Sequence, residues 1–208
     1  MIYKLYEWHL LRNLDSIPQV ICFMISDDEM KDDPAHIRRI ISWCLEISEK
    51  VQKNSSKNTG ISEIIIHISS LCPENQPSFI TEIYNLSDIV KVHLHYKEKT
   101  ETFGTGIPVT IAIGKSGREE ISDAIRSMVD DKIRPEDLTN EVLEQYLTFS
   151  HTPDCVIKTG GAHLVDFLIW QSVYSELFFL DLNWEKIRKT DLIRAFRDFQ
   201  SRNRRFGA

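Results

Sequence analysis

The sequence contains no long apolar run, and this absence argues against a membrane-spanning protein. Its longest apolar stretch, residues 167–182, is interrupted by five polar residues, two of them acidic, whereas a transmembrane helix needs about 20 predominantly apolar residues. The first residues also lack the basic region and the small-residue cleavage site of a signal peptide. We therefore expect a cytoplasmic protein with no membrane span and no export.

An excess of positive charge is also missing. The chain has 25 Lys and Arg residues against 31 Asp and Glu residues, which gives a formal net charge of -6. Such a balance argues against broad, sequence-independent attraction to nucleic acid or to an anionic membrane. A local basic patch is still compatible with it, so we expect no nucleic-acid partner and at most peripheral membrane contact.

Cysteine is sparse and widely spaced. Cys22, Cys44, Cys72 and Cys155 form no Cys-x-x-Cys pair, the close spacing that metal and redox motifs use. Three of the four lie in or beside apolar runs, where thiols usually pack as small hydrophobic groups. The sequence therefore predicts reduced, buried thiols.

Short apolar runs that alternate with longer segments of helical period are abundant. With 208 residues and 42% hydrophobic content, the chain fits a single domain over residues 1–208. The alternation is typical of an α/β protein in which helices cover both faces of a mainly parallel, Rossmann-like sheet. Six strands are expected, at Val20–Ile25, Glu63–Ile68, Lys91–Tyr96, Pro108–Ile113, Asp154–Lys158 and Leu177–Asp181.

Helical periodicity is clearest after Pro34, where apolar residues from Ile37 to Ile47 form one stripe with charges on the opposite face. The stretches Gln52–Gly60 and Lys97–Gly106 are polar and contain glycine, so both are predicted to be loops. Further helices are expected at Ser78–Val90, Arg118–Asp130, Pro135–Leu147, Leu164–Ser175 and Thr190–Arg204.

Three local patterns could carry chemistry, but each has a simpler structural interpretation. Gly114-Lys115-Ser116 ends like a phosphate-binding loop, yet Val109 stands where the motif requires glycine. His93 and His95 share one strand face and could bind a metal with His67 or Cys72 only if the strands were neighbours. Ser69-Ser70 could supply a nucleophile, but no motif places a base beside it.

The segment from Thr152 to Trp184 decides between function classes. It reads Thr-Pro-Asp-Cys-Val-Ile-Lys-Thr-Gly-Gly-Ala-His, then Phe-Leu-Ile-Trp-Gln, then Tyr-Ser-Glu-Leu-Phe-Phe-Leu-Asp-Leu-Asn-Trp, and the chain ends Arg-Arg-Phe-Gly-Ala. This order of motifs closely resembles the C-terminal signature of the cis-prenyltransferases, the undecaprenyl and dehydrodolichyl diphosphate synthases. Upstream, Ser42–Glu46 and Gly117–Arg126 are similar to two helices of that family. The resemblance implies the cis-prenyltransferase fold over nearly the whole chain.

Two departures from the family pattern concern its catalytic residues. In the family the first strand ends in Met-Asp-Gly-Asn, whose Asp holds magnesium and diphosphate; Ser26 stands at that Asp, and Asp27, Asp28 and Glu29 follow it. In the second motif Ala162 replaces a Glu, and Lys158 replaces an Arg whose planar fork grips two phosphate oxygens. The resemblance therefore implies no catalytic residue and no metal site in this chain. The acid-rich residues after Ser26 are predicted to be a flexible, solvated loop.

The best-preserved part of the pattern is the one that acts between subunits. In the family the C-terminal third builds the dimer interface and sends an Arg-x-Gly terminus to the partner's active site, which here points to Arg205 and Gly207. A chain that has lost the catalytic residues but keeps the Arg-x-Gly terminus resembles the Nogo-B receptor type of subunit. The resemblance implies a catalytic cis-prenyltransferase partner that supplies Mg²⁺, and isoprenoid diphosphates bound in the complex.

Aromatic residues cluster where that interface is expected, and large rings dominate interface energies when a partner buries them. The interface residues predicted in this way are Trp170, Glu176, Phe178, Phe179 and Trp184. The chain is also short before Ile111, where helices of bacterial relatives wall a tunnel for the growing lipid.

Three functions remain open at this point. The leading one is a non-catalytic subunit, inactive alone, of a heteromeric enzyme that makes long-chain polyprenyl diphosphate from isopentenyl diphosphate and an allylic diphosphate. The second is an active homodimeric synthase with a divergent first motif. The third is a scaffold protein of the same fold with no role in lipid synthesis.

Overall fold

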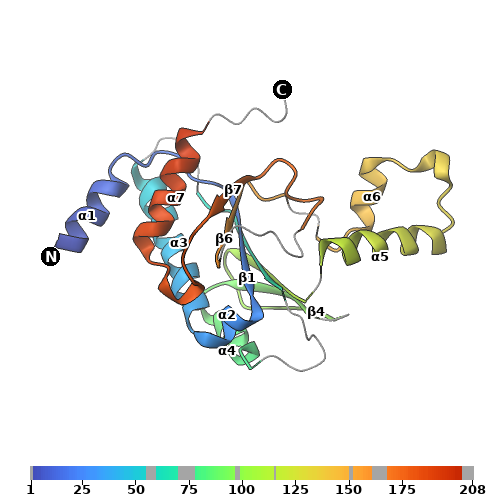
Figure 1. The fold of residues 1–208 in the computed structure, drawn as a ribbon, viewed down its shortest axis with the longest axis horizontal. Coiled ribbons are helices and arrows are strands. Elements are labelled where there is room, and N and C mark those ends of the chain that lie inside the picture. The colour runs from blue at the N-terminus through green and yellow to red at the C-terminus, as the bar shows by residue number, and fades with distance from the viewer. Residues whose placement is uncertain are drawn as a thin grey trace.

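The core of the protein is a twisted sheet of seven strands, in the order β4-β3-β5-β2-β1-β6-β7 (Figure 1). The computed structural model describes residues 2–54, 60–69, 78–96, 99–114, 116–149, 152–160 and 168–202, without the side chains of residues 2–4. All strand pairs are parallel except β3 with β4. The strands are β1 (Val20–Ser26), β2 (Glu63–Ser69), β3 (Lys91–Tyr96), β4 (Lys99–Phe103), β5 (Pro108–Ile113), β6 (Cys155–Lys158) and β7 (Glu176–Phe179).

The six predicted strands are present within a residue or two, and the α/β fold class is confirmed. The seventh strand, β4, lies inside Lys97–Gly106, so the loop predicted there was wrong. Its residues are largely exposed and few are apolar, so its sequence carries no strand signal of its own. Pairing with β3 makes it a strand, with Thr102 hydrogen-bonded to His93 and Thr100 to His95.

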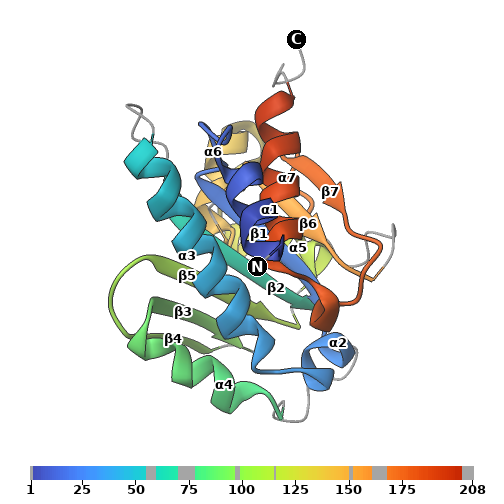
Figure 2. The same ribbon diagram turned by 90° about the vertical axis from the view of Figure 1, so that its left-hand side faces the viewer.

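Helices lie on both sides of the sheet. In Figures 1 and 2, α3 and α7 lie against one side, α1 lies outside them, and α5 and α6 project from the opposite side. The helices are α1 (Ile2–Leu11), α2 (Asp27–Asp32), α3 (His36–Asn54), α4 (Ile80–Tyr84), α5 (Gly117–Asp130), α6 (Asn140–Tyr146) and α7 (Lys189–Ser201), with short 3-10 turns at Asn85–Asp88, Pro135–Asp137 and Trp184–Lys186.

Helix prediction failed at three places. Helices α1 and α2 were not expected, and α2 replaces the predicted acidic loop. The helix predicted over Leu164–Ser175 is wrong for its described part, because residues 169–174 form turns. Its first residues, up to Phe167, lie outside the described part of the chain.

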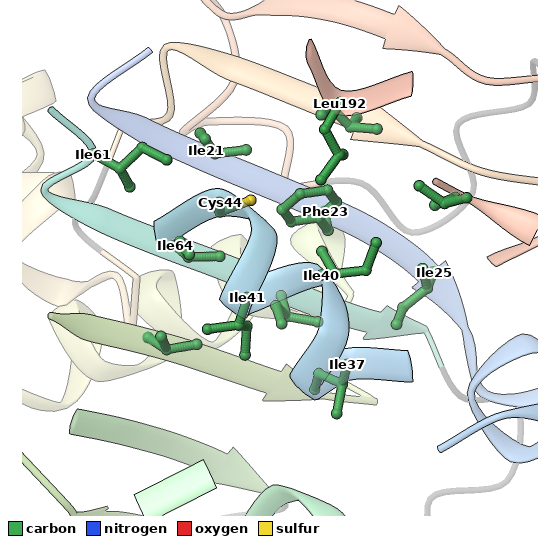
Figure 3. Close-up of a cluster of buried hydrophobic side chains, with 14 of the residues drawn as sticks. Ile21, Phe23, Ile25, Ile37, Ile40, Ile41, Cys44, Ile61, Ile64 and Leu192 are labelled. Carbon is green, nitrogen blue, oxygen red and sulfur yellow. The ribbon is translucent and has the colours of Figure 1, made fainter. Parts of the chain in front are cut away.

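The main hydrophobic core lies between the sheet and α3 with α7. Figure 3 shows Ile21, Phe23 and Ile25 of β1 meeting Ile40 of α3 and Leu192 of α7. The predicted apolar stripe of α3 is buried at Ile37, Ile40, Ile41, Cys44 and Ile47. Each fully buried aliphatic side chain of this kind stabilises the fold by about 1.5–3 kcal/mol.

Cys22, Cys44 and Cys155 are free and buried, which confirms the packing predicted for them. Burial disfavours the thiolate and raises the pKa of Cys22 to about 12. Cys72 lies outside the described residues. Within the described part of the chain, no helix combines the length and apolar character needed to cross a membrane.

Candidate functional site

The place to look for a ligand site is the carboxyl end of β1. Strand β2 lies on one side of β1 and β6 on the other. The chain builds the sheet first on the β2 side of β1 and then on the β6 side, so a topological switch point lies between β1 and β6. In open α/β sheets, ligands bind outside the carboxyl ends of the strands at such a switch point. Ser26 ends β1 here, and Thr159 and Gly160 follow β6.

A capping box at the end of β1 converts the acid-rich segment into helix α2. The Ser26 Oγ accepts a hydrogen bond from the Glu29 backbone N–H at 3.3 Å, and the Glu29 Oε2 accepts from the Ser26 N–H at 3.1 Å. Ser-x-x-Glu is the sequence of a capping box, which satisfies backbone donors at a helix start. The flexible loop predicted for this segment is therefore corrected to an ordered helical turn.

The Glu29 carboxylate lies beside the backbone that follows β6. Its Oε1 accepts a hydrogen bond from the Trp184 backbone N–H at 3.2 Å. A Cβ on Gly160 would come within 3.0 Å of the same Oε1, and Gly160 has a φ of +68°, which glycine adopts without strain. A carboxylate of the chain itself thus occupies this corner of the switch point and accepts hydrogen bonds from Ser26 and Trp184.

The remaining polar residues of the motif are engaged locally. Asp27 and Asp28 form ion pairs with Lys31 at 3.1 and 3.4 Å. The Lys158 ammonium donates to the Thr159 carbonyl oxygen. Across the described residues, no three His, Cys, Asp or Glu side chains are arranged to hold a metal ion. Ala162 lies outside those residues.

A buried aromatic cluster lies beneath this corner. The Trp184 ring is fully buried, with its centroid 6.2 Å from Phe23 and 5.5 Å from His36. His36 also meets Trp43 edge to face at 5.7 Å. Burial, with a smaller contribution from the positive charge of Arg39, lowers the pKa of His36, so the neutral imidazole is favoured.

The five predicted interface residues are divided between core and surface. Trp184 is fully buried and Phe178 is 7% exposed, so both pack within this chain, and we correct the prediction that their rings face a partner. Phe179 is 44% exposed, as expected for strand residues that alternate between faces. The Trp170 Nε1 donates to Glu144 on α6 at 3.2 Å. Glu176 forms an ion pair with Arg202 at 2.9 Å.

Arg202 fixes the point where the C-terminal tail begins. It also bonds Asp198 at 2.7 Å, and its guanidinium carbon lies 4.2 Å from the centre of the Phe178 ring. Glu176 starts β7, so this anchor lies at the amino edge of the parallel sheet, opposite Ser26. Arg205 and Gly207 lie outside the described residues.

The alternative motifs acquire structural roles. Strand β5 separates β2 from β3, so His67 is not beside His93 and His95, and the metal set that includes His67 is not assembled. Cys72 and Ser70 lie outside the described residues. Ser116 caps α5 in a second capping box, and the Ser69 Oγ donates to the Ile25 carbonyl oxygen at 3.3 Å.

Sequence reasoning missed an exposed apolar surface on α5, the α5–α6 connection and the turns after Leu168. Large side chains there are 44–68% exposed, namely Ile125, Val129, Leu138, Ile169, Val173 and Tyr174. Ile125 and Val129 are four positions apart and share one face of α5, whereas Met128 is buried.

A buried polar network joins α5 to the turns that follow Leu168. Glu120 is 2% exposed and accepts from the Phe149 N–H at 2.8 Å and from the Gln171 amide at 3.0 Å. Gln171 also donates to the Phe149 carbonyl oxygen at 2.8 Å. These hydrogen bonds hold α5 against the turns that carry Trp170.

Comparison with known proteins agrees with this fold and motif order. A family model described as "Putative undecaprenyl diphosphate synthase" matches residues 15–207. The chain is 45% identical to a tritrans,polycis-undecaprenyl-diphosphate synthase of Thermococcus kodakarensis, over 98% of this chain and 74% of the relative. A synthase of the same name from Methanocaldococcus jannaschii is 37% identical over 58% of this chain, and that match spans just under half, 46%, of the relative. Lavandulyl diphosphate synthase from Lavandula x intermedia superposes with a TM-score of 0.64 at 18% identity, covering 92% of this chain and 99% of that structure.

Proposed function

The chain belongs to the cis-prenyltransferase family of undecaprenyl diphosphate synthases, and from this premise we propose that it is a non-catalytic subunit of a heteromeric synthase. The complex condenses isopentenyl diphosphate with an allylic diphosphate to make a polyprenyl diphosphate. The partner holds the Mg²⁺ that neutralises the leaving diphosphate. This chain contributes its C-terminal tail and a docking surface.

The observation that carries the proposal is the Glu29 carboxylate at the switch point between β1 and β6. It accepts from Ser26 and from the Trp184 N–H, and it lies against Gly160. A diphosphate placed in the same corner would meet this carboxylate at close range. Two unit charges 4 Å apart repel by about 4 kcal/mol at an effective dielectric constant near 20.

The metal position supports the same conclusion. Mg²⁺ is normally bound through one or two carboxylates together with substrate phosphate. Ser26 offers a hydroxyl that already caps α2. Asp27 and Asp28 lie on α2 and pair with Lys31.

The position of Arg202, the last described residue, supports action of the C-terminal residues on another subunit. The tail starts at Arg202, which is tied to Glu176 at the amino edge of the sheet, whereas Ser26 and Gly160 lie at the carboxyl edge. In Figure 1 the end of α7 and helix α2 lie at opposite edges of the sheet. An arginine near the end of such a tail can bind a diphosphate oxygen pair in a neighbouring subunit.

The apolar surface on α5, its connection to α6 and the turns after Leu168 is the proposed docking surface for the partner. Helices α5 and α6 project from the body of the molecule (Figure 1), and no described residue of α6 is buried. Val129 and Val173 are 68% and 64% exposed. Patches of exposed large apolar side chains mark interaction sites.

A second candidate function is an active homodimeric synthase. The observation that favours it is the identity with the Thermococcus kodakarensis protein, whose name is that of a synthase specific for geranylgeranyl diphosphate. In that case the divergent Ser26–Glu29 segment must rearrange to admit substrate and Mg²⁺, with loss of the hydrogen bonds of Glu29.

Prenyl transfer should be assayed with Mg²⁺, isopentenyl diphosphate and geranylgeranyl diphosphate, using this chain alone, a catalytic cis-prenyltransferase of the same organism alone, and both together. We expect turnover only in the mixture, or turnover in the mixture at least tenfold higher than that of either chain alone. Glu29→Gln in the mixture should leave turnover unchanged, because this corner takes no part in the chemistry.

Robust turnover by the pure chain that is lost in Glu29→Gln or in Glu176→Gln would establish the homodimeric synthase instead. A stable complex whose turnover equals that of the partner alone would support the scaffold function. The three outcomes are therefore distinguishable in one set of assays.

A further inference from the structure

A small pocket lies between α6, which projects from the body of the molecule (Figure 1), and the turns after Leu168. Its lining includes Glu144, Phe149, Trp170, Gln171, Val173 and Tyr174. Its volume of about 260 Å³ is below the range of about 300–1,000 Å³ that is usual for small-molecule sites. The pocket borders the exposed apolar surface described above, because Val173 and Tyr174 belong to both. Its size and place therefore suit a single side chain of a docked partner.

The charge of the pocket lining is negative. Glu144 accepts a hydrogen bond from the Trp170 Nε1–H at 3.2 Å, and in the part of the chain that the structure describes no basic residue forms an ion pair with it. None of the described residues that line the pocket is basic. A carboxylate has about four acceptor positions, and the indole uses one of them. The pocket therefore favours a cationic occupant.

Gln171 adds an acceptor that the chain leaves unused. Its side chain is 3% exposed, and its amide nitrogen donates to Glu120 Oε2 at 3.0 Å and to the Phe149 carbonyl oxygen at 2.8 Å. These two bonds fix the orientation of the amide, and its Oε1 finds no hydrogen-bond partner among the described residues. A buried acceptor without a partner is unfavourable, so a donor group that enters the pocket removes this cost.

We propose that this pocket receives an arginine side chain of the catalytic partner subunit, an inference that rests on the docking surface proposed above. A guanidinium is planar and carries five N–H donors. It can pair with the Glu144 carboxylate, donate to Gln171 Oε1 and stack on the Trp170 indole. A lysine ammonium lacks the plane that stacks on an indole, and an apolar side chain leaves both acceptors unpaired. One carboxylate, one buried amide oxygen and one indole together therefore select arginine.

Entry of the arginine requires a local rearrangement. Gln171 Oε1 is covered in the unbound chain, whereas Val173 and Tyr174, which also line the pocket, are 64% and 56% exposed. Rotamer changes of interface side chains are common when complexes form. Arginine and tryptophan are also enriched among the residues that dominate binding energy. The pocket is thus suited to anchor the partner beside the apolar surface.

The first test uses the intact chain without its partner. N-acetyl-L-arginine amide is titrated into isotope-labelled chain while NMR follows the indole N–H resonance of Trp170, which is identified by its loss in Trp170→Phe. We expect a saturable shift, with a Kd at least threefold lower than that of N-acetyl-L-citrulline amide, a probe of similar shape without the charge. Glu144→Gln should raise the Kd of the arginine probe at least threefold, because the charged acceptor is lost. Glu141→Gln, which removes an exposed carboxylate of α6 outside the pocket, should leave it unchanged.

The second test measures the affinity of the chain for the catalytic cis-prenyltransferase of the same organism. Glu144→Gln should weaken the complex at least tenfold, because the partner's arginine stays buried without its charged acceptor. Glu141→Gln should bind this synthase like the wild type. Circular dichroism checks that both variants keep the native fold.

The outcomes separate this inference from the proposed function. Equal affinities for the arginine and citrulline probes, or wild-type affinity of Glu144→Gln for the synthase, would overturn the inference and leave the proposed function intact. Absence of any complex between the wild-type chain and the synthase would refute the proposed function and this partner together, and only the arginine selectivity measured with the probe would stand. Self-association of the wild-type chain that is lost in Glu144→Gln would assign the pocket to a second copy and overturn the assignment to the catalytic subunit.

Discussion

Gly160, directly after β6, lies against the carboxylate of Glu29 in α2, and a Cβ at Gly160 would come within 3.0 Å of Glu29 Oε1. Two segments 131 positions apart therefore meet at the switch point between β1 and β6. The contact brings a backbone in the left-handed conformation against a carboxylate side chain.

This contact should be visible in stability. Gly160→Ala places an L residue at a φ of +68°, which costs roughly 1–2 kcal/mol, and it crowds Glu29. In urea denaturation, Gly160→Ala should lower the free energy of unfolding by about that amount when Glu29 is present. The decrease should be smaller in a Glu29→Ala background. Asp28→Ala, whose side chain is 84% exposed, is the control background. Equal losses in the Glu29→Ala and Asp28→Ala backgrounds would contradict the contact.

The tail can be tested separately from assembly. Arg205→Ala should lower turnover of the heteromeric complex by at least tenfold without weakening assembly, because a charge-assisted contact with diphosphate is lost and ~1.4 kcal/mol corresponds to tenfold. Deleting residues 206–208 should act similarly. Arg204→Ala, outside the Arg-x-Gly motif, is the matched control. Full turnover by a stable complex that lacks the last four residues would exclude this role.

Mutation of exposed apolar residues tests the docking surface and, separately, the predicted interface residue Phe179. Val129→Glu on α5 and Phe179→Glu on β7 should each abolish co-purification with the catalytic partner and leave a folded chain, because a charge is expensive to bury in an interface. Both side chains are at least 44% exposed, so the isolated chain tolerates the change. Leu5→Glu on α1 is the control. Undiminished co-purification of Val129→Glu would place the partner elsewhere.

His36 should make stability depend on pH. Its folded-state pKa is lowered, first by burial and then by Arg39, so the unfolded chain binds its proton more readily than the folded chain. The free energy of unfolding should therefore fall as pH drops below the ordinary histidine value of about 6.5. The urea midpoint should decrease less with falling pH in Arg39→Gln than in the wild type. In His36→Phe the contribution of this histidine to the decrease should be absent. An unchanged profile in His36→Phe would assign the effect to other groups.

Local pattern determined much of the fold. The α3 stripe and the apolar strands are visible in the sequence because the periods of 3.6 and 2 residues are local properties of the backbone. The motif order from Thr152 to Trp184 identified the family for the same reason, since neighbours along the chain suffice to recognise it. The prediction of a single domain over residues 1–208 remains a prediction.

Tertiary structure alone decided the features of the site. Glu29 bonds the backbone of Trp184, 155 positions later, and no local pattern reports such a contact. Strand β4 exists because β3 supplies its hydrogen bonds, and His67 is separated from His93 because β5 lies between their strands. Trp184 and Phe179 look alike in sequence, but only one is buried. These outcomes depend on which elements become neighbours in space, and that is set by the packing of the whole sheet.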